Sequence, residues 1–420
     1  MRVSLLFALS AACAQTQSAN PAAVSPKPVS LGGAFTAITA LEFSPEGELF
    51  VADSGSGIIH ALVPPEASNP AAGAPYNFKN LDAAIASALG TSADAIRVQD
   101  LAIHPKSKEA YIAVLRAGSS SYESTVMVVN QTGQVRMLEP TLKTTAARVP
   151  ATPAEGFSFY DEVPARSLTF TDLEYYQGRL LVAGLSNADF ASSLWSLATP
   201  LSDSVDTTTV EIYHAVHNQR ETRAPIRAMK VVELNDEPYL VAAYTCTPLV
   251  AFPLSKLVDG AHVTGMTIGE LGYGNTPADM LAFTGQDMEQ KPFPVVFMTH
   301  KNQSAQVLPL QGLANAVKGP GLAEPVMMMS KVDLGASEVP ITGVLHIADQ
   351  NENMLVGLRR DAEEGDLELV TFLKNVYFRL TDFQSEYEIP GYVYGPEAEQ
   401  IKQFQNTMKQ AENKPEFVRE

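Results

Sequence analysis

Short apolar runs separated by turn-forming residues dominate the pattern of hydrophobic and polar positions along the chain. Most runs have about four to eight residues, are rich in β-branched and aromatic side chains, and end at Gly, Pro, Asn or Asp. In the clearest example, a run at residues 40–43 leads through a polar turn at 44–47 into a second run at 48–52. Runs paired across a tight turn predict antiparallel strands, and therefore an all-β protein.

This strand pair recurs along the chain in six copies. Their first and second runs lie at residues 40–43 and 48–52, 101–103 and 109–114, 168–173 and 179–183, 229–233 and 239–243, 280–283 and 295–298, and 344–347 and 354–358. The copies are spaced by roughly 61 residues, which is room for four short strands. One four-stranded sheet cannot bury both of its faces, so such units pack around an axis until a ring closes.

We therefore predict a single six-bladed β-propeller over residues 31–394, with seven blades as the alternative if one copy has diverged. The strand that closes the ring would come from residues 29–31 or from residues 376–380. Two segments depart from the strand pattern and have apolar residues at helical spacing. Residues 80–90 predict a short insertion helix that ends at Gly90, and residues 395–420 predict a C-terminal helix that opens at Pro396. We expect both helices to dock on the ring.

The N-terminus has the features of a secretory signal peptide. Arg2 precedes a short apolar run at residues 3–9, and small residues follow up to Ala14. We expect cleavage after residue 14, a flexible leader at 15–30, and a secreted or periplasmic protein. Lipid attachment at Cys13 is the alternative. No later run is long and apolar enough to predict a transmembrane helix.

Composition narrows the range of partners. The 420 residues include 29 Lys and Arg against 47 Asp and Glu, a formal net charge of −18, and 45% are hydrophobic. The apolar content is that of a globular protein and argues against a mainly disordered chain. The excess of acidic residues argues against binding of nucleic acid, which requires clustered Lys and Arg. We expect a monomer.

Residues 43–59 resemble the NHL repeats of secreted β-propellers. Three further segments, at 178–187, 210–217 and 243–250, are similar to a group of uncharacterised exported bacterial propeller proteins. The resemblance implies a propeller fold and export, and it carries no activity with it.

Four residues from two distant loops form a candidate metal site. In a propeller, the loop before the first strand of a blade and the loop between its second and third strands lie on one rim. In the fourth blade these loops contain His214, His217 and Glu221 on one side and Cys246 on the other. Imidazole and thiolate ligands suit a transition metal such as zinc or copper. Alternatively, the histidines pack in surface loops and Cys246 is a small buried residue.

A second pattern concerns one position near the start of the first strand in each copy. This position is an arginine at Arg97, Arg166 and Arg227 and an acid at Asp279. Because first strands line the channel of a propeller, these side chains would converge and bind a small anionic ligand, since guanidinium groups pair with carboxylate or phosphate. Alternatively, the arginines pair with Asp100, Asp172 or Asp279 or bond loop carbonyls, and so hold the blades together.

The three consecutive methionines at 327–329 are expected to pack in the core or at a strand edge rather than to bind copper, because their spacing does not gather the sulfurs.

We expect a ligand- or partner-binding module that acts through the rim around residues 214–227 and 245–248. One alternative is a propeller enzyme with its site on the same rim, either a metal-dependent lyase or hydrolase or an oxidoreductase component. Another is a surface scaffold without a small-molecule site. Coordination distances among His214, His217, Glu221 and Cys246 would discriminate between a binding module and a metal enzyme.

Overall fold

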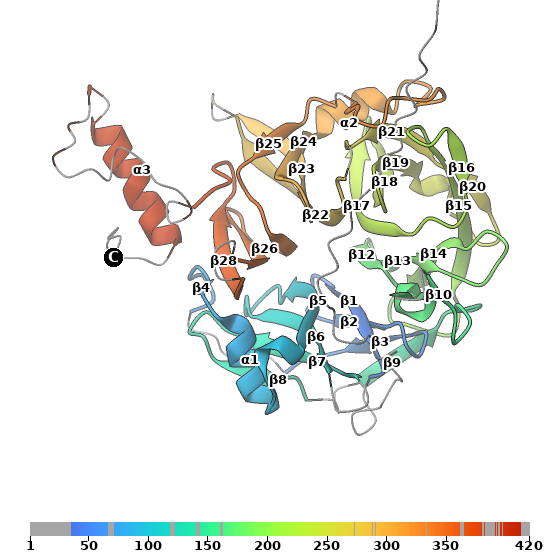
Figure 1. Ribbon diagram of the computed structural model, residues 1–420, viewed down its shortest axis with the longest axis horizontal. Coiled ribbons are helices and arrows are strands. Elements are labelled where there is room, and N and C mark those ends of the chain that lie inside the picture. Colours follow the sequence, from blue (N-terminus) through green and yellow to red (C-terminus); the bar gives the residue numbers. More distant parts are fainter. Residues whose placement is uncertain are drawn as a thin grey trace, which may run out of the picture.

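The computed structural model describes residues 35–412 apart from 66–70, 118–121, 140–142, 160–162, 273, 288, 290, 333, 362–364, 380–381, 383–390, 392, 394 and 397. Within these residues the strands form six antiparallel blades around a central axis (Figure 1). The predicted signal peptide and leader lie outside the described residues. All six predicted strand pairs are present, so the six-bladed β-propeller is confirmed.

The blades have the following strands, given from the channel outward. Blade 1 comprises β1 (Ile38–Phe43), β2 (Leu49–Asp53), β3 (Ile58–Leu62) and β9 (Lys143–Arg148). Blade 2 comprises β5 (Ile96–Ile103), β6 (Ala110–Ala117), β7 (Tyr122–Val129) and β8 (Val135–Met137). Blade 3 comprises β12 (Asp172–Tyr176), β13 (Arg179–Leu185), β14 (Ser192–Ala198) and β15 (Asp206–His214), and both β16 (Gln219–Glu221) and β20 (His262–Thr264) pair with β15.

Blade 4 comprises β17 (Ile226–Leu234), β18 (Glu237–Tyr244), β19 (Pro248–Pro253) and β21 (Met266–Glu270). Blade 5 comprises β22 (Pro277–Gln286), β23 (Pro292–His300), β24 (Ala305–Pro309) and β25 (Ser337–Val339). Blade 6 comprises β26 (Val344–Asn351), β27 (Met354–Arg360), β28 (Leu367–Leu373) and β4 (Asn77–Phe78). A separate small hairpin pairs β10 (Ser158–Phe159) with β11 (Val163–Pro164).

The blades do not follow chain order around the ring. The inner strand β1 contacts β5 on one side and β12 on the other, and β5 in turn contacts β26. Going around the axis, the order of blades is therefore 2, 1, 3, 4, 5 and 6, with blade 6 next to blade 2 (Figure 1). After β3 the chain crosses to blade 6 as β4, builds blade 2, and then returns to blade 1 as β9. Blade 2 is thus inserted within the sequence of blade 1.

Two short strands close the ring, and neither is the one expected from the sequence. β4 pairs with β28 through Leu369 and Phe78, and β9 pairs with β3. Residues 376–379 form no strand, so the closing strand predicted there is wrong, whereas residues 29–31 lie outside the described part of the chain. A two-residue strand such as β4 leaves no alternating pattern by which the sequence could reveal it.

Apolar side chains fill the contacts between neighbouring blades. For the described residues, each of the six interfaces has its own buried cluster, including the one between blades 2 and 6 and the one between blades 1 and 3. In the latter cluster Trp195 of blade 3 packs with Phe50 of blade 1, and both are fully buried. These clusters hold the unusual blade order in place, because each blade buries its face against the neighbour in space.

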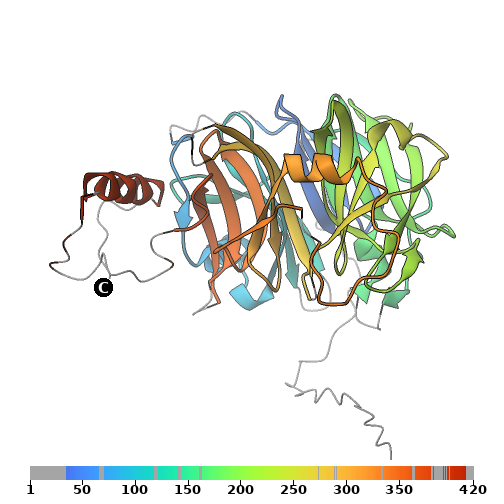
Figure 2. The same ribbon diagram turned by 90° about the horizontal axis from the view of Figure 1, so that it is seen from above.

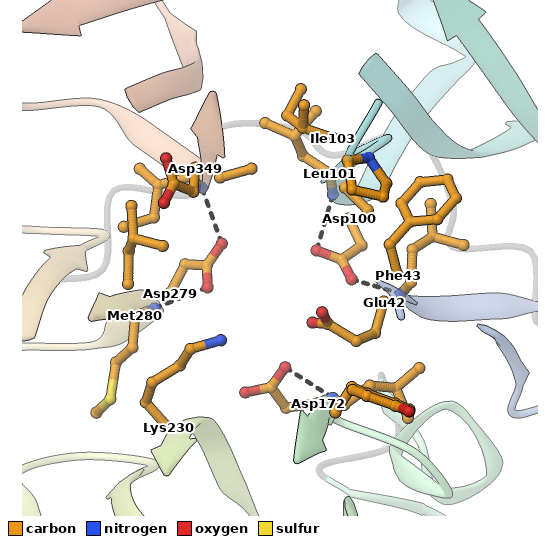
Figure 3. A pocket seen from close by; sticks show the side chains of 18 of the residues that line it. Glu42, Phe43, Asp100, Leu101, Ile103, Asp172, Lys230, Asp279, Met280 and Asp349 are labelled. Carbon is orange, nitrogen blue, oxygen red and sulfur yellow. Dashed lines mark hydrogen bonds between the residues drawn. The ribbon is translucent and has the colours of Figure 1, made fainter. Parts of the chain in front are cut away.

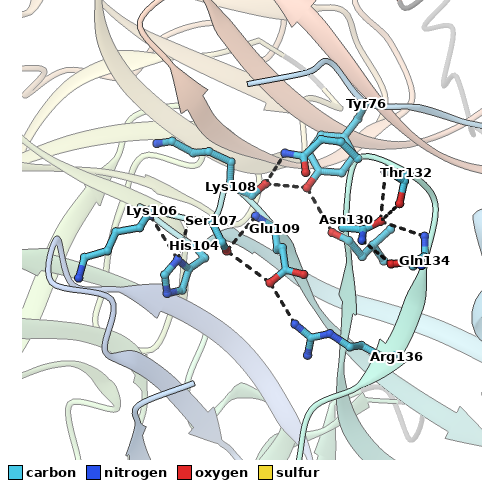
Figure 4. A network of polar contacts seen from close by, with 12 residues as sticks. Tyr76, His104, Lys106, Ser107, Lys108, Glu109, Asn130, Thr132, Gln134 and Arg136 are labelled. Atoms are coloured by element: carbon cyan, nitrogen blue, oxygen red, sulfur yellow. Dashed lines mark hydrogen bonds and ion pairs between the residues drawn. The ribbon is translucent and has the colours of Figure 1, made fainter. Parts of the chain in front are cut away.

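Tyr76 links blades 6 and 2 beside the closing strand. Its backbone N–H donates to Thr371 Oγ1 of blade 6 at 2.8 Å, and its hydroxyl donates to the carbonyl of Lys108 at 2.7 Å (Figure 4). The same hydroxyl lies 3.2 Å from the carbonyl of Val129. The ring is fully buried, and this one residue joins two blades that are far apart in the sequence, through its backbone to blade 6 and through its hydroxyl to blade 2.

Within the described residues, three α-helices pack against the outside of the blades. α1 (Leu81–Leu89) confirms the insertion helix, and it ends at Gly90, whose φ of 63° favours glycine. Leu81 and Ile85 of this helix join the cluster between blades 2 and 6. α2 (Leu310–Ala316), which the sequence pattern did not predict, packs on blades 4 and 5.

α3 (Ala398–Ala411) confirms the C-terminal helix. It lies outside the ring beside β28 of blade 6, as both views show (Figures 1 and 2). The Phe378 and Phe404 rings approach to 6.0 Å between centroids. Among the described residues, no helix has the length and apolar character needed to cross a membrane.

Candidate functional site

A hairpin at the end of blade 3 and a turn in blade 4 build the candidate metal site. β15 ends at His214, the chain reverses through residues 215–218, and β16 returns antiparallel so that Gln219 pairs with His214 and Glu221 with Ile212. Residues two apart on a strand share a face, which places Glu221 diagonally beside His214. The turn 245–247 joins β18 to β19, and the N–H of Thr245 donates to the carbonyl of Pro225 before β17. Both segments lie on the rim at which the inner strands begin, called the leading rim.

The structure brings His214, His217, Glu221 and Cys246 together, and we call them the rim cluster. Glu221 Oε1 lies 2.8 Å from His214 Nδ1 and 3.3 Å from His217 Nδ1. One donor atom each from His214, His217 and Cys246 lies within 4.8 Å of the other two. His214 is buried, Cys246 is partly exposed and His217 is exposed, so the cluster opens to solvent on one side.

A buried network orients His214 from behind. Its Nε2 lies 3.1 Å from Thr247 Oγ1, and the Thr247 hydroxyl donates to Glu270 Oε2. Glu270 Oε1 accepts the N–H of Ala215 at 2.9 Å, so this carboxylate holds both loops of the site. Neither Thr247 nor Glu270 belongs to a sequence motif, and sequence reasoning missed both.

The carboxylates determine the charge of His214. Burial alone would lower its pKa, but hydrogen bonds with Cys246 and Glu221 and the charges of Glu221 and Glu270 raise the pKa to about 9. Burial likewise acts to raise the pKa of Glu221, yet its bond with His214 leaves that pKa below its ordinary value. The two groups form an ion pair at neutral pH, in which Glu221 fixes the orientation of the ring.

Cys246 has a strained backbone. Its φ is 82°, in the left-handed region that non-glycine residues rarely adopt. Such conformations cost on the order of 1–3 kcal/mol and persist where the surrounding structure imposes them, most often at functional positions. The strained turn holds the free thiol of Cys246 beside the imidazoles.

The arginines do not share a register. Arg97 precedes the β-bulge of β5, Arg227 occupies the bulge of β17, and Arg166 lies in a 3₁₀ turn, η2 (Ala165–Leu168), before β12. The predicted equivalence of these residues and Asp279 is therefore wrong. The bulges and loops of unequal length shift the phase of each copy, so counting along the sequence does not align them.

Only one of the three arginines lines the described channel. Arg97 donates to the carbonyls of Asp94 at 2.7 Å and Ile96 at 2.9 Å. Arg166 donates to the Thr152 hydroxyl and pairs with Glu155 at 3.8 Å. Arg227 lines a cavity of about 250 Å³ at the mouth of the channel, together with Asp279.

Three aspartates at the start of inner strands link neighbouring blades. Asp100 Oδ2 accepts the N–H of Leu41 at 2.6 Å, so it joins blade 2 to blade 1. Asp172 Oδ2 accepts the N–H of Met229 at 2.7 Å, joining blade 3 to blade 4. Asp279 Oδ2 accepts the N–H of Ile347 at 2.8 Å, joining blade 5 to blade 6. Figure 3 shows the three carboxylates directed into the channel.

The alternative expectation is confirmed in part, because Arg97 and Arg166 do bond backbone carbonyls. The bonds that join the blades, however, run between the three aspartates and backbone amides. The sequence carried a signal for them: each aspartate precedes a Leu or Met at the start of a first strand, in the pairs 100–101, 172–173 and 279–280. The N–H of that next residue also donates to its aspartate.

The channel is rich in acidic groups. Burial raises the pKa of Glu42 to about 8 and that of Asp279 to about 7, and it also raises the pKa of Asp172. Lys230, which pairs with Glu174, lines a second cavity of about 360 Å³, and the three aspartates line this cavity too (Figure 3). His346 lies 3.2 Å from Asp100, and this contact raises its pKa against the effect of burial.

The methionines at 327–329 are exposed, so the prediction that they pack in the core or at a strand edge is wrong. They form a turn after α2, in which the N–H of Ser330 donates to the carbonyl of Met327 at 2.8 Å.

The fold and the two sites define a six-bladed β-propeller with a thiol–imidazole cluster on one rim. No family model matches the chain, and no curated protein matches it. Among solved structures, the PQQ-bound aldose sugar dehydrogenase of Streptomyces coelicolor is 10% identical, with 80% of this chain and 94% of that chain covered and a TM-score of 0.31. A putative glucose dehydrogenase of Thermus thermophilus is 11% identical, with coverages of 81% and 97% and a TM-score of 0.32.

Extracellular domains 1–2 of Drosophila semaphorin 1b are 8% identical, with coverages of 79% and 84% and a TM-score of 0.34. Function has to be argued from the residues of this chain.

Proposed function

We propose that this protein is an exported binding propeller that holds a transition-metal ion on its leading rim. His214, His217 and Cys246 would ligate the ion, and Glu221 would orient the two imidazoles. The observation that carries the proposal is the convergence of three metal-ligating atoms, from two separate loops, within 4.8 Å of one another. The signal-peptide pattern of residues 1–14 supports export.

The donor set is that of a tetrahedral site with one open position. Zinc–nitrogen bonds of about 2.0–2.1 Å and zinc–sulfur bonds of about 2.3 Å place neighbouring ligand atoms about 3.3–3.8 Å apart. The ligand atoms, now within 4.8 Å of one another, would therefore approach by up to about 1.5 Å on binding. The exposed His217 can supply this movement, whereas His214 is already held by its buried network.

The role of Glu221 follows from its position. A carboxylate that accepts a hydrogen bond from a ligating histidine sets its ring orientation and raises its basicity. Glu221 contacts Nδ1 of both imidazoles, so it would hold the two rings in place. To ligate an ion, His214 would exchange the contact of its Nε2 with Thr247 Oγ1 for the ion and release a proton. An open fourth position would admit a small ligand, and the same geometry would serve an enzyme if that ligand were activated water.

Titration of the purified protein with Co²⁺ tests this proposal, because a cobalt–thiolate bond gives a charge-transfer absorption band. We expect one equivalent to bind and Cys246→Ser to abolish the band, since this variant removes the thiolate. His217→Ala should weaken binding by about tenfold or more. His262→Ala is the matched control, because His262 is another exposed histidine of blade 3 that lies outside the rim cluster. Absence of stoichiometric binding, or a band that survives Cys246→Ser, would contradict the proposal.

A further inference from the structure

Three exposed methionines form a turn on the surface of the propeller, here called the Met turn (residues 327–330). The exposed fractions of Met327, Met328 and Met329 are 78%, 55% and 78%. Single exposed apolar side chains are common on protein surfaces, but three in succession at the tip of one turn form an apolar surface feature that calls for a role. The backbone hydrogen bond from Ser330 to Met327 closes the turn that carries the three side chains.

The Met turn is fastened to the elements that build the rim cluster. On its N-terminal side, the N–H of Val326 donates to the carbonyl of Ala215 at 3.2 Å, and Ala215 directly follows His214. On its C-terminal side, the N–H of Val332 donates to the carbonyl of Glu270 at 3.1 Å, and Lys331 bridges to Leu271. The segment after α2 runs beside β21 in Figure 1. Both ends of the turn are therefore held next to the metal site.

Glu270 connects the two features. Its backbone carbonyl holds the end of the Met turn, while its carboxylate accepts bonds from Ala215 and Thr247 beside the histidine and cysteine loops. One residue thus fixes the positions of the thioether turn and of the thiol–imidazole cluster relative to each other. The long, unbranched methionine side chains have the reach and freedom to turn toward an ion at the cluster.

The combined donors favour one metal. Thioether sulfur is a poor ligand for hard cations, and together with thiolate it selects monovalent copper. Imidazole also suits copper, so the histidines of the rim cluster add donors and the preference of the sulfur ligands for monovalent copper is kept. Leucine would have filled an exposed apolar turn equally well in shape, whereas methionine adds a soft ligand atom at each position.

We infer that the metal of the leading rim is Cu(I), and that the Met turn supplies thioether ligands to it beside Cys246 and the two histidines. The inference rests on the proposed rim site and adds the identity of the ion and a second ligating segment. Binding requires no change in the oxidation state of the protein or the metal.

An anaerobic competition experiment with Cu(I) tests the inference. Reduced protein competes for Cu(I) with bicinchoninate, a chromophoric chelator, and the number of sulfur atoms around copper is measured by X-ray absorption. The test variant is Met327→Leu/Met328→Leu/Met329→Leu, which keeps the apolar volume on an exposed turn and so preserves the fold. Met137→Leu is the matched control, because Met137 is also an exposed methionine but lies in β8 of blade 2.

We expect the triple variant to bind Cu(I) at least about tenfold more weakly and to show fewer sulfur neighbours, with Co²⁺ binding unchanged and the control variant like wild type. Cu(I) affinity and sulfur count that both survive the three substitutions would overturn the inference and leave the rim site intact. Failure of the proposed function is distinct: neither Co²⁺ nor Cu(I) binding would then respond to Cys246→Ser.

Discussion

Glu42 offers a sharp test of the electrostatics of the channel. It lies on the innermost strand of blade 1 and points into the channel beside Asp100, with Lys230 across from it (Figure 3). Burial, together with the charges of Glu174 and Asp100, raises its pKa from the ordinary 4.5 to about 8, although Lys230 acts in the opposite direction. The perturbation is Glu42→Gln, which keeps the shape of the side chain and removes its ionisation.

Whether the free energy of unfolding rises or falls with pH follows from the protons that the Glu42 carboxyl binds in the folded and the unfolded chain. Below pH 4.5 the carboxyl is protonated in both the folded and the unfolded chain, so it does not affect the balance between them. As the pH rises from 4.5 to about 8, the unfolded chain releases the proton while the folded protein retains it, and the free energy of unfolding falls. Above about 8 the loss is complete. Glu42→Gln does not undergo this loss.

The size of the effect is bounded by the difference between the two pKa values. That difference corresponds to a loss of at most about 5 kcal/mol in unfolding free energy, because each unit of pKa difference is worth about 1.4 kcal/mol. Glu42 is partly exposed to solvent in the channel, which screens the penalty, so we expect about 2 kcal/mol. Relative to wild type, Glu42→Gln should therefore gain about 2 kcal/mol in unfolding free energy between pH 4.5 and 8.

Urea unfolding at a series of pH values measures this difference. Trp195 is the single tryptophan and is fully buried, so its fluorescence reports unfolding directly. The matched control is Glu46→Gln, because Glu46 lies exposed in the turn after β1. A stability difference between Glu42→Gln and wild type that stays constant with pH, or shrinks as the pH rises, would refute the reasoning.

Three further substitutions test the packing, the backbone and the closure of the ring. Gly184→Ala should destabilise the protein by about 3 kcal/mol or more in thermal unfolding, because the added Cβ would lie 1.8 Å from the carbonyl oxygen of Thr169; a near-wild-type melting temperature would contradict this packing. Cys246→Gly should be about 1 kcal/mol more stable than Cys246→Ala in urea, because glycine adopts the φ of 82° without strain; equal stabilities would argue against that strain. Tyr76→Phe should cost about 1 kcal/mol through loss of its hydroxyl bond to Lys108, measured by urea unfolding, and an unchanged midpoint would argue against this link between blades.

Local patterns were sufficient to predict much of the fold. The apolar runs of the six strand pairs arise because a strand packs one face against each neighbouring blade, so both of its faces are apolar, and this holds wherever the blade lies in the ring. The insertion helix at 81–89 was equally visible, because its apolar spacing and terminal Gly90 are local features. The grouping of the 214–221 and 246 loops followed from propeller geometry, in which both loops leave the same end of their strands.

Other features depended on contacts that no local pattern encodes. The methionines of the Met turn were expected in the core or at a strand edge, but their exposure depends on the path of the segment after α2 along β21. The prediction that Arg97, Arg166 and Arg227 occupy equivalent positions was wrong, because bulges and loops of unequal length shift the position of a residue from one copy to the next. Glu270 could not be identified as the link between the rim cluster and the Met turn, since its partners come from blades 3 and 4 and from the chain after α2.

The sequence by itself determined that this chain forms six strand pairs of a propeller and which loops share a rim, but it set the strand bounds only approximately: the strand expected at 168–173 is β12 at 172–176. Only the tertiary structure decided which blades are neighbours, with blade 2 between blades 1 and 6 and with β4 and β9 closing the ring. The physical reason is that an apolar run gives a strand two apolar faces, since successive side chains point to opposite sides. It does not specify which other strand pairs with the backbone at its edge. Edge pairing is made by backbone hydrogen bonds that any sequence offers, and the choice among edges is settled when all six blades bury their faces at once.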